Sequence, residues 1–211
     1  MTFLQIINKV LIRLREAQVT TADQSDYSVL IGEFVNETKR EVEDAHNWNS
    51  LRTTVTVNTV QGTTQYALTN AGKRFNILDV YETTTDSFLP RGNAIRMKKE
   101  IEEASQAQPT HYYIEGVDAN GDLQMHVALT PDAVYTYNVH LKVPQAALTG
   151  STECTMDEWP IILGAYSKAL EERGEDQGAA TTAAMSKYGS AVADAIALDI
   201  QMTKDEDEWY V

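Results

Sequence analysis

Cysteine is nearly absent from this chain of 211 residues, since Cys154 is the only one. A single cysteine excludes an internal disulfide framework and a zinc site built from several thiolates. Proline and glycine are also scarce, with 5 and 11 residues, whereas hydrophobic residues make up 43% of the chain. This balance is typical of a globular protein and excludes a disordered or fibrous one.

Basic residues are outnumbered by acidic ones. The 17 Lys and Arg residues and the 31 Asp and Glu residues give a formal charge of −14 (17 − 31). A general surface for DNA, RNA or an anionic membrane is therefore not expected, because each needs clustered Lys and Arg. No apolar run approaches the ~20 residues of a membrane span, and residues 1–8 lack the positive segment of a secretory signal. We expect a protein that is intracellular at synthesis and has no membrane partner.

Motifs of catalysis are missing as well. The chain has no G-x-S-x-G, no glycine-rich phosphate loop and no H-E-x-x-H. The acidic run at residues 171–176 is interpreted as a solvated helix end, and Cys154 has no histidine close to it in sequence. We therefore predict no catalytic, cofactor-binding or metal-binding residues and no cofactor.

Two patterns resemble metal sites but lack ligands. The acidic turn at residues 118–122 places oxygen ligands at positions 1, 3 and 5 of a calcium loop, yet Leu123 and Leu129 stand where glycine and glutamate are needed. An Asn-Gly hairpin turn explains the same residues. His126 and His140 fall on the polar sides of neighbouring predicted strands, and one register would bring them together. Zinc would still need a third ligand, so we interpret both as solvated or hydrogen-bonded histidines.

The N-terminal region predicts two helices. Apolar residues recur at helical spacing over residues 3–14. A second helix is predicted to be capped by Ser25 or Asp26 and to end near Trp48. The short link between the two favours an antiparallel hairpin.

Helical signals return near the C-terminus. Asp157 is predicted to cap a helix that carries Trp159 in its apolar stripe and ends at Gly174. Residues 177–203 predict a last, alanine-rich helix with a stripe that runs from Met185 to Ile200. Its small side chains suit close packing in a bundle.

The middle of the chain alternates apolar and polar residues with the period of β-strands. The last three predicted strands are expected to form a meander, each with one buried face. An edge piece is predicted at 88–90 and a short helix at 94–105. Strands are predicted at residues 51–60, 65–68, 75–81, 112–117, 123–129 and 134–143.

These elements predict an α+β fold without βαβ alternation, so a parallel nucleotide-binding sheet is not expected. An antiparallel helical bundle is built from both chain ends, residues 1–50 and 153–203. An antiparallel β-rich domain with one short helix, residues 51–152, is inserted between them. An extended C-terminal tail occupies residues 204–211.

The tail is predicted to be a docking peptide for a partner protein. Trp209 and Tyr210 bury a large area with few rotatable bonds, and the preceding acids would steer the segment to a basic groove. The alternative is a frayed, disordered end. The predicted docking residues are Asp205, Glu206, Asp207, Glu208, Trp209, Tyr210 and Val211.

Several segments together resemble a known family. They are TTVTVNTVQGTTQYAL, KRFNILDVY, PTHYYIEG, DLQMHVALTPDAVYTYNVHLKVP and DEWPIILGAYSKALEE. This arrangement, over residues 3–200, is similar to the head-to-tail adaptor (connector, tail tubular protein A-like) proteins of tailed bacteriophages. Its motifs are tyrosine-rich strands, a Pro-Asp turn and a helix headed by a tryptophan.

The resemblance implies a structural virion protein of the neck, made in the host cytoplasm. It implies a ring, commonly of twelve copies, that sits beneath the portal protein and receives the tail nozzle. Viral DNA would pass through this channel without specific binding, and the C-terminal tail would extend onto the portal. The alternatives are a tail-terminator, neck-completion or assembly-chaperone protein, or a small hydrolase that uses the acidic cluster or His126 and His140.

Overall fold

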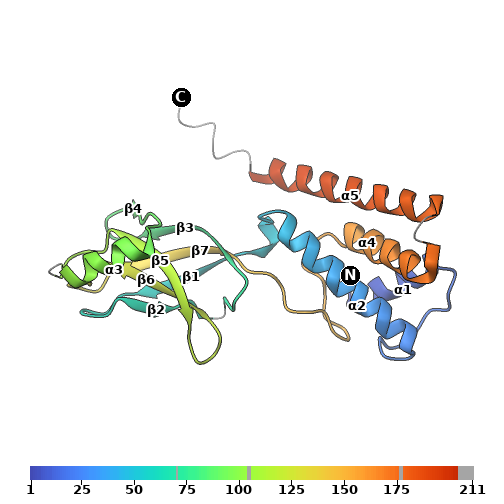
Figure 1. The fold of residues 1–211 in the computed structure, drawn as a ribbon, viewed down its shortest axis with the longest axis horizontal. Helices are drawn as coiled ribbons and strands as arrows, with labels where there is room; N and C mark the ends of the chain where they lie inside the picture. The colour runs from blue at the N-terminus through green and yellow to red at the C-terminus, as the bar shows by residue number, and fades with distance from the viewer. Residues whose placement is uncertain (70, 104–105, 176–177, 204–211) are drawn as a thin grey trace. The chain divides into compact units, whose positions relative to one another are not determined.

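The computed structural model describes residues 1–69, 71–103, 106–175 and 178–203 and combines helices with antiparallel sheets (Figure 1). The predicted α+β class is thereby confirmed. The predicted docking tail, residues 204–211, lies outside the described residues. The chain divides into two units, here called the helical unit (Met1–Leu51 with Gln145–Val211) and the β-rich unit (Arg52–Pro144).

The helices of the helical unit begin where the sequence supplies capping side chains. Thr2 and Ser25 each accept a hydrogen bond from the backbone N–H three residues ahead, and Asp157 accepts one from Trp159 N at 3.0 Å. Each cap satisfies an N–H group that the first helical turn leaves unpaired. Ser25, not Asp26, is the cap of the second helix. The helices are α1 (Phe3–Arg13), α2 (Asp26–Ala45), α4 (Glu158–Leu170) and α5 (Ala179–Thr203), with short η1 (Asn49–Leu51) and η2 (Glu171–Glu175).

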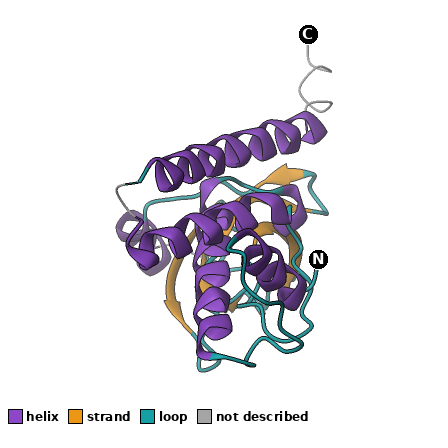
Figure 2. Cartoon of the chain, turned by 90° about the vertical axis from the view of Figure 1, so that its right-hand side faces the viewer, coloured by secondary structure: helices purple, strands orange, loops and turns teal. Residues whose placement is uncertain are grey.

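One hydrophobic core joins these helices, and α4 contacts α1, α2 and α5 (Figure 2). α4 is apolar on most of its circumference, as expected for a helix surrounded by others. Burying each large aliphatic side chain contributes about 1.5–3 kcal/mol to folding. The fully buried members include Ile6, Ile7, Val10, Ile31, Val35, Ile161 and Ala165.

Two predictions about the buried faces of these helices are wrong. Trp159, predicted in the stripe of α4, is 49% exposed, and the guanidinium of Arg13 lies 4.8 Å from the centre of its ring. Met185 and Ile200, predicted in the stripe of α5, are also about half exposed, at 48% and 47%. The residues of α5 that pack against the core are Ala184, Tyr188, Val192, Ala195 and Ile196, and Met185 and Ile200 fall outside this set.

The β-rich unit contains two antiparallel sheets with a common hydrophobic core. α3 (Ala94–Glu103) packs on the second sheet through Met97, which lies with Tyr113 and Ala128 in a small separate cluster. The first sheet has the order β1 (Arg52–Asn58), β7 (Thr136–Lys142), β3 (Asn76–Glu82), β4 (Ser87–Phe88). The second has the order β2 (Gln65–Ala67), β6 (Leu123–Ala128), β5 (His111–Val117).

The predicted meander of the last three strands is wrong. β5 pairs with β6, but β7 leaves that sheet and lies between β1 and β3 in the other one. His126 and His140 are consequently in different sheets. The alternation of apolar and polar residues determines which face of a strand is buried, but it does not determine which other strand pairs with that strand. The buried face of β7 consists of Tyr137, Val139 and Leu141.

Close contact between helices in the helical unit depends on Gly164 of α4. A Cβ atom there would lie 2.3 Å from Cγ2 of Thr38 and 2.9 Å from the Tyr188 ring. We expect Gly164→Ala to lower the free energy of unfolding by about 1–3 kcal/mol, because overpacking forces α4 away from its neighbours. Chemical denaturation measures this change.

The matched control is Gly189→Ala on α5, where a Cβ atom meets nothing within 4 Å. This change should be neutral or stabilising by up to about 1 kcal/mol, because alanine favours the helix. Equal destabilisation by the two substitutions would contradict the packing described here.

Candidate functional site

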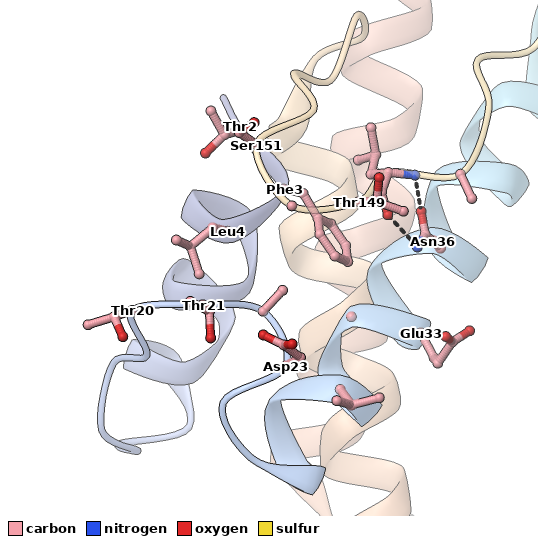
Figure 3. A pocket seen from close by; sticks show the side chains of 16 residues that line it. Thr2, Phe3, Leu4, Thr20, Thr21, Asp23, Glu33, Asn36, Thr149 and Ser151 are labelled. Carbon is pink, nitrogen blue, oxygen red and sulfur yellow. Dashed lines mark hydrogen bonds between the residues drawn. The ribbon is translucent and has the colours of Figure 1, made fainter.

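A groove of about 780 Å³ opens on the helical unit (Figure 3). It is formed by the start of α1, the connection to α2, one side of α2 and the segment that precedes α4. The lining residues are Thr2, Phe3, Leu4, Thr20, Thr21, Ala22, Asp23, Val29, Gly32, Glu33, Asn36 and residues 147–151. It therefore joins segments that are more than 100 residues apart in the chain.

The floor of the groove is apolar and closely packed. The Phe3 ring points from α1 toward Gly32 of α2, where a Cβ atom would lie 3.0 Å from Cζ of the ring (Figure 3). Leu148 is fully buried beside it, whereas Val29 is 46% exposed on the wall. A glycine at position 32 thus allows the tip of the Phe3 ring to approach α2 closely.

Asn36 fixes the far wall of the groove. Its side-chain amide donates to the carbonyl oxygen of Leu148 at 3.1 Å and accepts from the Leu148 N–H at 2.8 Å (dashed in Figure 3). The two bonds satisfy both backbone groups of a residue that belongs to no helix or strand. This segment is therefore held on α2 by direct hydrogen bonds.

A buried ion pair continues this attachment one turn further along α2. The Lys39 ammonium lies 2.7 Å from Oε1 of Glu43, and the two side chains are only 4% and 1% exposed. Lys39 also donates to the carbonyl oxygen of Gln145 at 2.6 Å, while Glu43 accepts from the Gln145 N–H at 2.9 Å. The Lys39 ammonium and Oε1 of Glu43 thus bond to each other and to one residue of the returning chain.

The rim of the groove is acidic. Asp23 and Glu33 are exposed on opposite sides of it, and no Lys or Arg is among the lining residues. A floor of Phe3 and Leu148 with carboxylates at the rim favours an apolar side chain accompanied by a basic one.

A second surface is the uncovered end of a stripe along α5. The stripe recurs every three or four residues and is buried or half-buried over its first five members. Leu198 and Met202 continue it but are 58% and 78% exposed. The covered members are mostly small, with Tyr188 among them, and the last two members are large, apolar and exposed. The members are Thr181, Ala184, Tyr188, Ala191, Ala195, Leu198 and Met202.

The structure places the candidate metal residues in ordinary structural roles. Asp118 Oδ1 accepts hydrogen bonds from the N–H groups of Asn120 and Asp122, both at 2.9 Å, which makes a turn. His126 stacks on a tyrosine ring of β5, and His140 bonds to Thr54 of β1 at 3.0 Å. Within residues 1–69, 71–103, 106–175 and 178–203, no three His, Cys, Asp or Glu side chains are arranged to hold a metal ion.

The surroundings of Cys154 do not favour a reactive thiol. Cys154 is half-buried, and this burial raises the pKa of its thiol, which disfavours the reactive thiolate. Among the described helices, none combines the length and the apolar character needed to cross a bilayer.

Sequence reasoning missed both surfaces of the helical unit. The groove depends on the contact of residues 147–151 with α2, which no local pattern predicts. The one local signal was Gly32, an isolated glycine inside a helical pattern, because such a glycine indicates close approach of another group. The spacing of the alanines in the sequence indicates the α5 stripe, but it does not indicate which end of the stripe stays exposed.

Comparison with known proteins identifies one family. The family model described as "SU10 adaptor protein" matches residues 1–210, which is nearly the whole chain. No curated protein matches the sequence.

Loss of the Lys39 charge tests the importance of the buried pair with Glu43. We expect Lys39→Met to lower the free energy of unfolding by about 3–5 kcal/mol, because it leaves the Glu43 carboxylate buried without its counter-charge. The double variant Lys39→Met with Glu43→Leu should lose less than the single one, since no buried charge remains.

Urea unfolding of the wild type, both single variants and the double variant measures the coupling. Lys168→Met is a suitable control, because Lys168 pairs with Glu41 at 2.8 Å but is 26% exposed. Its loss should stay within about 1 kcal/mol. A Lys39 variant as mild as this control would mean that the pair does not hold the returning chain.

Proposed function

The chain belongs to the SU10 adaptor protein family, and from this membership we propose that it is the head-to-tail adaptor that joins the portal protein to the tail nozzle of a tailed bacteriophage. As a member of this family it is a phage structural adaptor protein. The single observation that carries the proposal is the match of the family over residues 1–210. In the neck, copies of the chain form a ring, with twelve as the expected number, and the ring is part of the channel for viral DNA.

The division of the chain supports this role. We assign residues 1–50 and 153–203 to a helical bundle from both chain ends, which acts as a stiff wedge between neighbouring copies. Its core is made of fully buried aliphatic residues, such as Ile7 and Ile161, and such cores resist deformation. The β-rich insertion, residues 51–152, and the tail, residues 204–211, are then available to contact other neck proteins.

The tail is proposed to dock on the portal protein. α5 is helical up to Thr203, so the tail begins directly at its end. The uncovered Leu198 and Met202 precede it, and in the sequence Trp209 follows Met202 after one heptad. We infer that the end of α5 and the tail form one contact, in which Trp209 and Tyr210 are the anchors. The acidic residues 205–208 steer the tail toward a basic surface.

The acidic balance supports passage of DNA without binding. A formal charge of −14 per copy repels phosphate and limits adsorption of the duplex to the channel wall. The channel surface of the assembled ring is therefore expected to be acidic or neutral, and a strongly basic lumen would overturn this part of the proposal.

Removal of the tail tests its docking role. We expect a chain that ends at Thr203 to lose at least about 100-fold in affinity for the portal protein, because two aromatic anchors each contribute about 2 kcal/mol or more. Mass measurement of the chain alone and mixed with portal gives the stoichiometry, and a titration gives the affinity.

Lys204→Ala is the matched control, since it leaves the acids and both aromatics in place. Unchanged portal affinity of the truncated chain would remove the tail from the contact. A ring of different copy number, or a chain missing from purified particles, would favour the tail-completion or assembly-chaperone alternative.

A second test concerns the uncovered end of the α5 stripe. Leu198→Asp and Met202→Asp should leave the unfolding midpoint of the free chain almost unchanged, because both side chains are already exposed. Assembly with portal should weaken at least about tenfold, because a charge would be buried at the contact. Ala197→Asp, one position away and also exposed, is the control and should assemble normally. Equal assembly of all three variants would contradict the role of the stripe.

A further inference from the structure

A cavity of about 380 Å³ lies on the β-rich unit. It is formed by the end of β3, the hairpin that leads to β4, the start of β7 and the segment before β5. The lining residues are Glu82, Thr85, Ser87, Phe88, Leu89, Gln108, Pro109, Thr110 and Tyr137. Unlike the groove of the helical unit, this cavity has a charged group in its floor.

Glu82 supplies that charge. It is the last residue of β3 and only 1% exposed. One carboxylate oxygen accepts from the N–H of Thr84 at 3.0 Å, and the other accepts from the N–H of Thr85 at 2.5 Å and from the Thr85 hydroxyl. Burial by itself raises the pKa of the carboxyl, but these hydrogen bonds outweigh it and hold the pKa below the ordinary value. The group is therefore ionised at neutral pH.

No basic side chain in the described part of the chain neutralises this carboxylate. Its hydrogen-bond partners among the described residues are all neutral threonine groups, and no Lys or Arg lines the cavity. A buried charge normally has a counter-charge, because desolvation is costly without one. The hydrogen bonds from Thr84 and Thr85 supply dipoles to the carboxylate but no positive charge.

Tyr137 adds a second unsatisfied group to the same cavity. It stands directly opposite Glu82 in the pairing of β3 with β7 and is fully buried. Its hydroxyl oxygen has no hydrogen-bond partner among the described residues. Burial, followed by the negative charge of Glu82, strongly raises the pKa of this hydroxyl, so it stays protonated. Since buried hydroxyls in native proteins are nearly always hydrogen-bonded, a missing partner is indicated.

The mouth of the cavity adds neutral polar groups. Phe88 pairs with Tyr81 and meets its ring edge-on at 5.5 Å between centroids, so its ring lies on the face of β3 opposite Glu82. Gln108 donates to the Thr85 hydroxyl at 3.3 Å, and that hydroxyl lies 2.9 Å from Ser87. Neutral polar groups around a buried carboxylate leave its charge without a counter-charge, which favours a cationic ligand.

We propose that this cavity binds the guanidinium group of an arginine side chain presented by another protein chain. A guanidinium has several N–H donors in one plane, so it can bond to Glu82 and to the Tyr137 oxygen together. A lysine ammonium is a point charge and lacks this planar set of donors. Gln108 has to swing from Thr85 to admit the group, and it then offers its amide oxygen as a further acceptor.

The inference does not require the adaptor ring, because the cavity is complete within one chain. The test is an NMR titration of the full chain with N-acetyl-arginine methylamide, read at the amides of Thr84 and Thr85. We expect saturable shifts at these two amides, with an affinity at least about tenfold above that of the uncharged, equally shaped N-acetyl-citrulline methylamide. The corresponding lysine compound and spermidine should bind more weakly than the arginine compound.

Two variants make the test specific. Glu82→Gln should reduce the arginine affinity at least about tenfold, because the charge is lost. Tyr137→Phe should reduce it about threefold or more, and it should unfold at the same or a higher temperature, because it removes only an unsatisfied hydroxyl. Glu115→Gln is the matched control, since this carboxylate is 48% exposed and already paired with Lys98 at 2.6 Å.

Each outcome either supports or overturns the arginine site. If Glu82→Gln does not fold because its turn is lost, the arginine affinity of Tyr137→Phe is compared with that of the wild type instead. Equal binding of the arginine and citrulline compounds, stronger binding of spermidine, or unchanged binding by Tyr137→Phe would overturn the proposal. These titrations use the single chain, so they can be interpreted even if the chain does not assemble into a ring. The arginine site and the adaptor ring are therefore tested independently of each other.

Discussion

The buried contact of Lys39 and Glu43 with Gln145 is the interaction on which the helical unit depends. It joins α2 to the chain at the point where the chain returns from the β-rich unit, more than 100 residues later. Asn36 repeats the attachment one turn away, at Leu148. With this segment held on α2, α4 begins beside α1 and α2 and buries its apolar circumference between them. The groove is a consequence, since its far wall is this same segment.

Side-chain size along α5 separates packing from recognition. Alanines at 184, 191 and 195 bring α5 close to α4, and Gly164 permits the approach from the other side. Beyond Ala195 the same stripe carries Leu198 and Met202, which are 58% and 78% exposed. Exposed apolar side chains of this kind are suited to contact a second chain, which agrees with a structural adaptor.

Two buried carboxylates illustrate how satisfaction of charge distinguishes scaffold from site. Glu43 has a lysine counter-charge at 2.7 Å and a backbone donor, so its role is structural. Glu82 is equally buried, but its partners are neutral, and the hydroxyl of Tyr137 beside it has none among the described residues. Burial of a charge is costly unless a counter-charge is present. Lys39 supplies the counter-charge for Glu43 in the helical unit, whereas the lack of one at Glu82 in the β-rich unit points to an external cation.

The sequence by itself determined the local elements of this protein. Helical periodicity and the caps at Ser25 and Asp157 located the helices, and alternation located the strands, because both signals depend on residues a few positions apart. The acidic composition and the family resemblance likewise needed no coordinates. Only the tertiary structure decided that β7 joins the other sheet, that Trp159 faces solvent and that Glu82 meets Tyr137. A periodic pattern reports which face of an element is apolar, but the partner that covers this face comes from a distant part of the chain.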